Sequence, residues 1–550
     1  MSQSPAQPSK AILALLLATV LAQSAVGAVG GLEPRPDDAS FARRRTERIR
    51  LLPRPPTPPK TTQPVFNVID QFIGAAWDSS PSKETPSLCD DATFLRRVYL
   101  DLIGLIPTPE AARKFVDDRD PKKRDRLVDE LLARRLDYAA HWTTFWEDAL
   151  ASAPVESISG VNTHGQYRHW LRTSFAENKP YDRMVSELLD PTTFGHKNFG
   201  LKEGAEKQRT FILNSNDVES AQSAANVAQV FLGTGMKCAA CHNHFLNNEW
   251  PQKRFLGFAS FFSGHDLELV RCEQHSGTRV PAQFPFSTPG VSAGAPAGVD
   301  QRLHRVSDLL IDPLNPRFSK ALVNRLWKRY FGLGLVEPVD DFREDRPASH
   351  PQLLDWLADD FVRNNFDFQH TIRLVLTSRA YQLKYDPARE DVFDLERPGQ
   401  PRYFRSPSLR RLSAEQWLDS VNFATRLKGR KRIYLDNYAP VLSQALGRPA
   451  SRQEVMTTRP EDPAVLQALE LMNGPELRTL ISAGDVPARL AAGSAESQVA
   501  EIYWIVLSRA PSEREIEEGQ KFLRKSGGGV DAITDFLWAL FVSPDFQYIR

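Results

Sequence analysis

Three features are scarce in this 550-residue chain. Excess charge is one: the formal net charge is +1, which gives no electrostatic reason to expect nucleic acid or an anionic membrane surface as a partner. Long apolar runs are another, because outside residues 11–22 no stretch approaches the roughly 20 residues that a membrane helix needs. The third is the apolar/polar alternation typical of strands. These scarcities predict a mainly α-helical protein with no integral membrane span after signal cleavage.

The first 64 residues have the composition of a leader and a tether. Lys10 precedes the apolar run, and the small residues Ala25 to Ala28 follow it, which is the three-part form of a secretory signal peptide. We expect a signal peptide over residues 1–28, cleaved after Ala28, and a periplasmic or secreted protein. An uncleaved anchor is the alternative, but a run of twelve residues is short for it. Residues 29–64 are rich in proline and arginine and predict a disordered tether.

Helical patterns fill most of the remaining chain. Apolar residues recur at helical spacing from Val68 and again from Phe94, and Thr108 followed by Pro109 is a typical helix start. Serines followed three residues later by Gln or Glu predict capping boxes, and they are Ser349, Ser413 and Ser512. A passage rich in Pro, Gly, Ala and Ser precedes residue 301 and marks a boundary. We therefore predict two helical domains, residues 65–265 and 301–550, joined by a linker over residues 266–300.

One short stretch holds most of the distinctive chemistry. Two of the four cysteines and two of the eleven histidines lie within the sequence KCAACHNHF, residues 237–245. A Cys-x-x-Cys-His run is the attachment signature of c-type haem, in which both thiols bond to the porphyrin and the histidine becomes the proximal iron ligand. The motif therefore predicts haem c held by Cys238, Cys241 and His242. Export agrees with this, because c-type haem is attached outside the cytoplasm in bacteria.

Several separated blocks resemble a known pair of secreted domains of planctomycete-type bacteria, the domain-of-unknown-function families 1549 and 1553. The blocks of the first half are FLRRVYLDLIGLIPTPEAARKFVDD, PYDRMVSELL, VFLGTGMKCAACHNHF and FLGFASFF, and those of the second include NPRFSKALVNRLWKRYFGLGLVEPVDDFRED, SHPQLLDWLADDF, RRLSAEQWLDS and LWALFVSPDFQY. The resemblance implies that the Cys-x-x-Cys-His block belongs to the first domain, and it implies no settled activity. This chain departs from relatives at Asn243 to Leu246, where they tend to have an acidic residue and a proline.

The sequence does not identify the second axial ligand of such a haem. His244 is too close to His242 to reach the opposite haem face easily, so His265 and His275 are better candidates, and Met236 is a weaker one. Once Cys238 and Cys241 are assigned to haem, two cysteines remain, Cys89 and Cys272, and they are available for one disulfide.

Two other interpretations of the motif stay open. A zinc site is one, formed by Cys238 and Cys241 with His244 or His242 and with Cys272 or His275, because thiolate and imidazole ligands suit zinc. A second pair of well-spaced ligands, which would favour zinc strongly, is absent from the sequence. The other interpretation is a Cys238–Cys241 disulfide in a secreted protein.

The function predicted from these features is electron transfer or another redox step outside the cytoplasm, with an extracytoplasmic redox partner. The alternative is an extracytoplasmic binding or hydrolytic protein that works with proteins of polysaccharide metabolism and whose Cys-x-x-Cys-His run is structural. Four residues near Arg325 and Arg343 are the candidates for hydrolytic chemistry, because paired carboxylates act as acid and base in glycoside cleavage. They are Asp340, Asp341, Asp345 and His350. Pairing of these aspartates with the arginines is the competing interpretation, and the sequence does not decide whether the protein is an enzyme.

Overall fold

The computed structural model forms two compact units, Met1–Glu47 and Arg48–Arg550. The predicted signal peptide lies outside the residues that the structure describes. The described residues are 38–82, 84–151, 163–193, 217–244, 249–271, 274–429, 432–433, 441–449, 452, 454–459 and 465–550. Within them the fold is mainly α-helical, as predicted, with two small antiparallel sheets, and no helix there is both long and apolar enough to cross a membrane.

The segment expected to be a disordered tether is ordered in part. Helix α2 covers Asp38–Ile49, with an acidic residue in its first turn and Arg48 in its last, which suits the helix dipole. Further on, the carboxylate of Asp78 accepts hydrogen bonds from Thr61, Thr62 and Gln63, at 2.6 to 3.0 Å. Proline spacing alone predicts an extended chain, but it does not reveal that these polar residues are anchored to the next helix.

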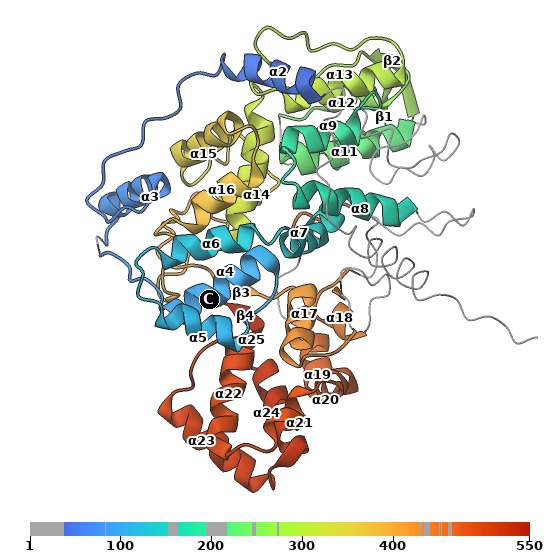
Figure 1. The fold of residues 1–550 in the computed structure, drawn as a ribbon. Helices are drawn as coiled ribbons and strands as arrows, with labels where there is room; N and C mark the ends of the chain where they lie inside the picture. Colours follow the sequence, from blue (N-terminus) through green and yellow to red (C-terminus); the bar gives the residue numbers. More distant parts are fainter. Residues whose placement is uncertain are drawn as a thin grey trace, which may run out of the picture. The chain divides into compact units, whose positions relative to one another are not determined.

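The first half of the chain is a series of helices (Figure 1). Thr108 caps α5, which confirms the predicted helix start. Asn67 also forms a capping box at the start of α3, and Gly104 ends α4 in the left-handed conformation. The elements are α3 (Val68–Ser79), α4 (Asp91–Ile103), α5 (Pro109–Asp117), α6 (Lys123–Leu132), α7 (Arg135–Ala149), α8 (Thr163–Ala176), α9 (Tyr181–Leu189), α11 (Asp217–Leu232), the 3-10 helix η2 (Lys237–Ala240), α12 (Gln252–Ala259) and the 3-10 helix η3 (Ser260–Phe262).

The expected linker, residues 266–300, contains a β-hairpin. Strands β1 (Leu267–Arg271) and β2 (Gln274–Val280) pair antiparallel, with Leu267 opposite Val280 and Val270 opposite His275. Every residue of β2 except Val280 is exposed. An exposed strand buries no face, so its sequence lacks the apolar/polar alternation that would have predicted it.

Helices also build the second half. Ser413 and Ser512 form the predicted capping boxes, whereas the box predicted at Ser349 is wrong, because His350 is the N-cap residue of α15 and makes no side-chain cap. The elements are α13 (Val299–Ile311), α14 (Pro316–Phe331), α15 (Pro351–Arg363), α16 (Phe368–Leu376), β3 (Arg410–Arg411), α17 (Ala414–Ala424), α18 (Val441–Ala445), α19 (Val465–Asn473), α20 (Pro475–Ala483), α21 (Val486–Leu490), α22 (Ala495–Leu507), α23 (Glu513–Lys525), α24 (Gly529–Phe541), α25 (Pro544–Gln547) and β4 (Tyr548–Ile549).

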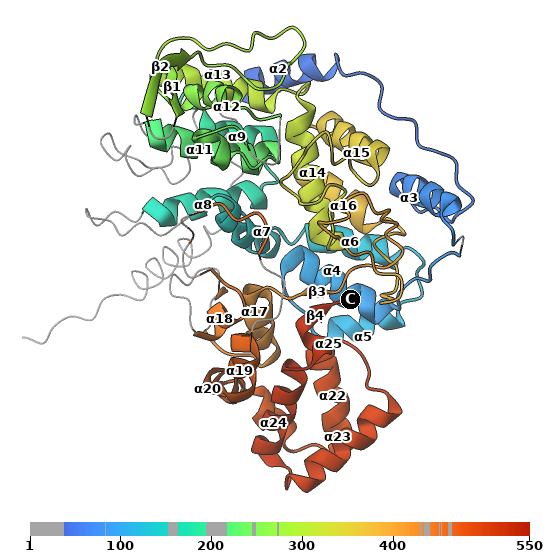
Figure 2. The ribbon, with the colours of Figure 1, turned by 180° about the vertical axis from the view of Figure 1, so that it is seen from behind.

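Helix α4 joins the first half of the chain to the second. Its apolar residues are buried, and so are its charged residues Arg96, Arg97 and Asp101. Arg96 donates to the carbonyl oxygens of Val506 and Phe546, both at 3.0 Å. Both views of the fold show α4 beside the short β3–β4 sheet, in which the end of the chain pairs with residues 410–411 (Figures 1 and 2).

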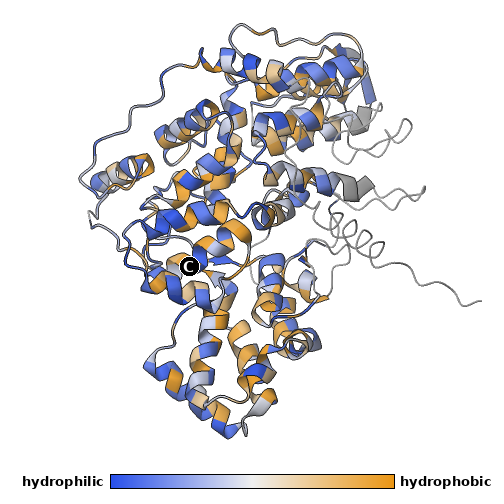
Figure 3. Cartoon of the chain, viewed as in Figure 1, coloured by the Kyte–Doolittle hydropathy of each residue, from blue (hydrophilic) through white to orange (hydrophobic). Residues whose placement is uncertain are grey.

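The C-terminal helices pack around one hydrophobic core, which Leu100 of α4 and Ile106 also join. Helix α22 contributes Val499, Ile502 and Val506 to this core, and α24 contributes Ile533 and Leu537. These helices carry hydrophobic residues on one side and hydrophilic residues on the other (Figure 3). The pattern is that of amphipathic helices packed around an apolar centre.

Replacing Gly104 by alanine tests the contact between α4 and α7. Gly104 has φ +67°, and an added Cβ would lie 2.4 Å from Nδ1 of His141. We expect Gly104→Ala to lower the free energy of unfolding by about 2–4 kcal/mol, from left-handed strain plus overpacking. Gly277→Ala is the control, because Gly277 has φ +76° and open space around it. This variant should lose only about 1–2 kcal/mol of unfolding free energy, from left-handed strain alone. Urea denaturation measures both losses, and equal losses would contradict the predicted contact.

Candidate functional site

The Cys-x-x-Cys-His motif begins at a junction between the two halves of the chain. Helix α11 ends at Leu232, and the next residues form hydrogen bonds with the loop after α14. Phe342 donates its backbone N–H to the carbonyl oxygen of Gly233, and Gly235 donates to that of Asp340, both at 3.0 Å. Gly233 has φ +60°, and an added Cβ would lie 2.8 Å from the Phe342 ring. The start of the motif is therefore held by the second half of the chain.

Gln252 fixes the other end of the motif. This first residue of α12 donates from its side-chain amide to the carbonyl oxygens of Ala240 at 3.2 Å and Val270 at 2.9 Å. Its backbone N–H donates to the side-chain oxygen of Asn243 at 2.9 Å. The hairpin, α12 and the motif are thus joined by one side chain.

The three predicted haem-binding side chains lie at the surface. Cys238 and Cys241 are exposed free thiols on and just after η2, so the structure does not contain the alternative Cys238–Cys241 disulfide. His242 is also exposed, and its Nδ1 lies 2.7 Å from the carbonyl oxygen of Asn243. A carbonyl oxygen can only accept, so Nδ1 carries the hydrogen, and the lone pair of the neutral ring is on Nε2.

The remaining ligand candidates are scattered. His265 is exposed before β1, His275 is exposed on β2, and Met236, which directly precedes η2, is buried. Cys272 lies outside the described residues. Across the part of the chain that is described, no three His, Cys, Asp or Glu side chains come together as a group that could hold a metal ion, and His244 joins no such group.

Burial distinguishes the aromatic residues after the motif and Cys89 from the exposed thiols. The aromatic residues after the motif, including Phe255, Phe258 and Phe261, are fully buried, so they fill the core. Cys89 is buried and its thiol is free, and Cys272, its predicted partner, lies outside the described residues.

The aspartates considered for hydrolytic chemistry are paired with arginines. Asp340 contacts Arg325 at 2.7 Å, Asp341 contacts Arg346 at 2.8 Å, and Asp345 contacts Arg343 at 2.5 Å. His350 is a packing residue, and burial lowers its pKa to about 4. The arrangement is therefore that of structural ion pairs.

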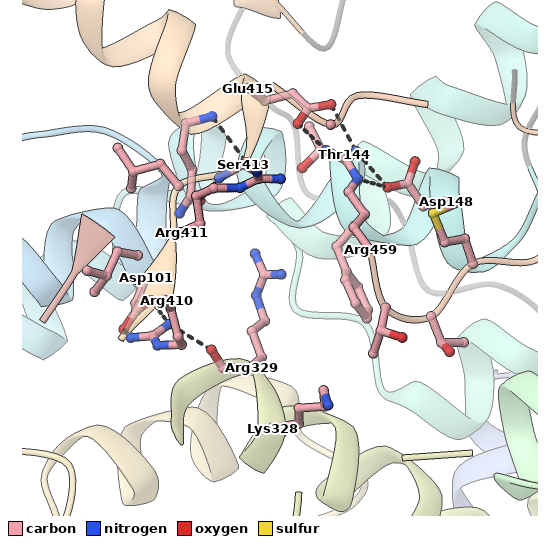
Figure 4. Close-up of a pocket in the computed structure, with 18 of the residues that line it drawn as sticks. Asp101, Thr144, Asp148, Lys328, Arg329, Arg410, Arg411, Ser413, Glu415 and Arg459 are labelled. Atoms are coloured by element: carbon pink, nitrogen blue, oxygen red, sulfur yellow. Dashed lines mark hydrogen bonds and ion pairs between the residues drawn. The ribbon is translucent and has the colours of Figure 1, made fainter. Parts of the chain in front are cut away.

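A cavity of about 180 Å³ is the feature that sequence reasoning missed (Figure 4). Its walls come from α4, α7, α14, β3, the start of α17 and residues 456–459. Its charged lining consists of Arg325, Lys328, Arg329, Arg410, Arg411 and Arg459 with Asp101, Asp148 and Glu415. The sequence signals are the pairs Lys328-Arg329 and Arg410-Arg411, which lie too far apart in the chain to be placed together without the structure.

Glu415 is the central acid of this cavity. It lies 2.6 Å from the Arg459 guanidinium, which also contacts Asp148 at 2.6 Å. Burial raises the pKa of Glu415, but the nearby guanidiniums of Arg459, Arg452 and Arg448 outweigh that effect and lower the pKa to about 2. The carboxylate is therefore charged throughout the physiological range.

This low pKa predicts how stability depends on pH. The folded-state pKa of about 2 lies below the ordinary 4.5, so the stabilisation is complete above pH 4.5 and is lost as the pH falls toward 2. We expect Glu415→Gln to lower the free energy of unfolding by about 3–5 kcal/mol near neutral pH, because it removes the buried negative charge that faces the guanidiniums of Arg459, Arg452 and Arg448. Urea denaturation should show the difference from the wild type shrinking below pH 4.5.

The control for this variant is Glu513→Gln. Glu513 is exposed in the first turn of α23, so its replacement should cost less than about 1 kcal/mol at any pH. A Glu415→Gln deficit that stays constant down to pH 2 would contradict the low pKa of Glu415.

Comparison with known proteins identifies the two halves of the chain. Residues 68–266 match the family model PSCyt2, protein of unknown function (DUF1549), and residues 302–440 match PSD1, protein of unknown function (DUF1553). The chain matches no curated protein and no solved structure. The two matches occur in the order predicted from the sequence blocks. The chain is therefore a protein of the DUF1549 and DUF1553 families, with one domain of each in that order.

Proposed function

We propose that this protein binds haem c covalently and serves electron transfer or another redox step outside the cytoplasm. The observation that carries the proposal is the exposure of two free thiols next to a histidine whose Nδ1 faces a carbonyl oxygen. A free thiol adds across a vinyl group of the porphyrin, forming a C–S bond while its hydrogen goes to the neighbouring carbon. No oxidant is needed, and Cys238 and Cys241 supply the two thiols.

His242 is the proximal ligand in this proposal. Its Nδ1 is held by the Asn243 carbonyl oxygen, which keeps the ring lone pair on Nε2. Metal-binding histidines usually donate their other ring N–H to a carbonyl or a carboxylate, and this hydrogen bond fits that pattern. The bound haem would supply reversible one-electron chemistry at its iron.

The arrangement of donors favours haem over zinc. A structural zinc ion needs four ligand atoms that converge at about 2.0–2.3 Å from one point. The described residues offer no such convergent group. Covalent haem attachment does not require convergence, because the two sulfurs bond to the porphyrin edge and only the imidazole binds the metal. The exposure of all three side chains also supports access for an extracytoplasmic redox partner.

His275 is the better candidate for the second axial ligand. It lies opposite Val270 in the hairpin, and the Val270 carbonyl shares the Gln252 amide with Ala240 of the motif. His265 lies beyond the other end of β1, before Leu267. His275 is thus linked to the motif through this hydrogen-bonded connection. Export rests on the signal-peptide pattern of residues 1–28 and remains part of the proposal.

Covalent attachment is the first test. The protein is expressed with its leader in a host that carries a c-type maturation system, and a haem-peroxidase stain is applied after denaturing electrophoresis. We expect a stained band from the wild type and from Cys89→Ser, whose thiol is buried. The double variant Cys238→Ser plus Cys241→Ser should lose the stain. A colourless wild type containing stoichiometric zinc would reject the haem proposal.

The axial ligands are tested by absorption spectra of the attached haem. His242→Ala should keep the covalent band but lose the wild-type spectrum, because the proximal ligand is removed and the thioethers remain. His275→Ala should convert a low-spin ferric spectrum to a high-spin one, whereas the matched variant His265→Ala should leave it unchanged. The reverse behaviour of the two histidine variants would assign the second ligand to His265.

A further inference from the structure

We propose that the cavity between α7, α14 and β3 binds a tetrahedral oxyanion, phosphate or sulfate, as a free ion or as the end group of a small ligand. This site is separate from the Cys-x-x-Cys-His motif, and the proposal does not depend on haem. It rests on the charge of the lining, the surroundings of Arg329 and the size of the cavity.

The lining carries an excess of positive charge. Among the described residues, six basic and three acidic side chains face the cavity. A lining with more basic than acidic groups attracts anions.

Most of the basic residues have a carboxylate partner already. Arg325 contacts Asp340, Lys328 contacts Glu337 at 2.9 Å, and Arg410 contacts Asp101 with both terminal nitrogens at 2.7 and 2.8 Å. Arg459 lies between Asp148 and Glu415 (Figure 4). These pairs fix the walls of the cavity.

Arg329 is different. Its guanidinium extends from α14 toward the space between Arg411 and Arg459 (Figure 4), and no carboxylate among the described residues lies within ion-pair distance of it. Its contacts are the Nε2 atom of His141 at 2.6 Å and the rings of Trp142 at 4.9 Å and Phe145 at 5.1 Å.

His141 supplies no compensating charge. Burial lowers its pKa well below the ordinary value, the neighbouring guanidinium of Arg329 lowers it further, and the ring is therefore neutral. A neutral imidazole accepts one hydrogen bond and leaves the other donors of Arg329 available. The aromatic rings position the guanidinium without neutralising it.

The size and shape of the cavity select the kind of anion. At about 180 Å³ it is smaller than the roughly 300–1,000 Å³ of ordinary small-molecule sites, so it holds a small ion or the end of a ligand. A carboxylate is planar, and one guanidinium can bind it through two parallel hydrogen bonds. Here the basic groups come from α14, from β3 and from residues 456–459 on different sides. That distribution suits a tetrahedral ion with oxygens in several directions.

The site is assembled from three parts of the chain. The DUF1549 region contributes α7, the DUF1553 region contributes α14 and β3, and residues 441–550, outside both family matches, contribute Arg459 and Ile549. An anion bound here would therefore hold all three parts together, and it should raise the resistance of the whole protein to unfolding.

Isothermal titration calorimetry with sodium phosphate, sulfate and acetate at constant ionic strength tests the proposal on the full-length protein. We expect phosphate and sulfate to bind and acetate to bind weakly or not at all. Arg329→Gln should weaken phosphate binding roughly ten- to hundredfold, the usual effect of losing hydrogen bonds from a charged group. The phosphate affinity of Arg329→Lys should lie between those of the wild type and Arg329→Gln, because lysine keeps the charge but loses the planar donor pair.

The matched control is Arg317→Gln, which makes the same substitution on the same helix. Arg317 also lies over two aromatic rings, Phe286 at 5.1 Å and Phe342 at 5.2 Å, but it does not line the cavity. The Arg317→Gln variant should bind phosphate with the affinity of the wild type. The Cys238→Ser plus Cys241→Ser variant should do the same, which separates this test from the haem proposal. Equal affinity of Arg329→Gln and wild type, or equal losses in Arg329→Gln and Arg317→Gln, would overturn the assignment.

A second measurement needs no variant. Phosphate should raise the thermal midpoint of the wild type above that found in sodium chloride of equal ionic strength, and no such difference would reject the site. Comparison of inorganic phosphate with glycerol phosphate then distinguishes the two sources of the anion. Tighter binding of the ester indicates an end-group site, and tighter binding of the inorganic ion indicates a free-ion site.

Discussion

The buried charges of α4 are the constraint on which the rest of the structure depends. The Arg97 guanidinium is almost completely buried, and it donates to the carbonyl oxygens of Tyr381, Leu383 and Arg550. A buried guanidinium is costly unless its donors are satisfied, so these carbonyls must be in place when the protein is folded. The last residue of the chain is one of the three. The position of β4, and with it one wall of the cavity, follows from this requirement.

Asp340 connects the cavity with the Cys-x-x-Cys-His motif. Its carboxylate pairs with Arg325 at the cavity wall and accepts a hydrogen bond from Thr457. Its backbone carbonyl accepts from Gly235, which lies three residues after the end of α11 and three before Cys238. The two sites are therefore linked through one residue of the loop after α14. The position of Asp340 therefore depends on contacts at both places.

Local chemistry explains which parts of the fold could be predicted from the sequence. Thr108, Ser413 and Ser512 cap helices through hydrogen bonds within three residues, and Gly104 ends a helix because it tolerates a positive φ. The motif at Cys238 was recognisable for the same reason, since its residues are consecutive. The sequence-based predictions failed where residues far apart in the chain determine the local structure. The hairpin in the expected linker buries little, and Arg97 looks like a surface residue until the carbonyls more than 280 positions away are known.

The cavity had no local signature, but its charge is informative because of the rest of the chain. The sequence has 69 basic and 68 acidic residues, so almost every charge has an opposite available. Arg325, Arg410 and Arg459 follow that rule, and each contacts a carboxylate. Arg329 does not: it is partly buried against His141 and two aromatic rings, and none of the described carboxylates pairs with it. A chain that pairs its charges so consistently departs from the rule at a cost in stability, and such departures concentrate at functional sites.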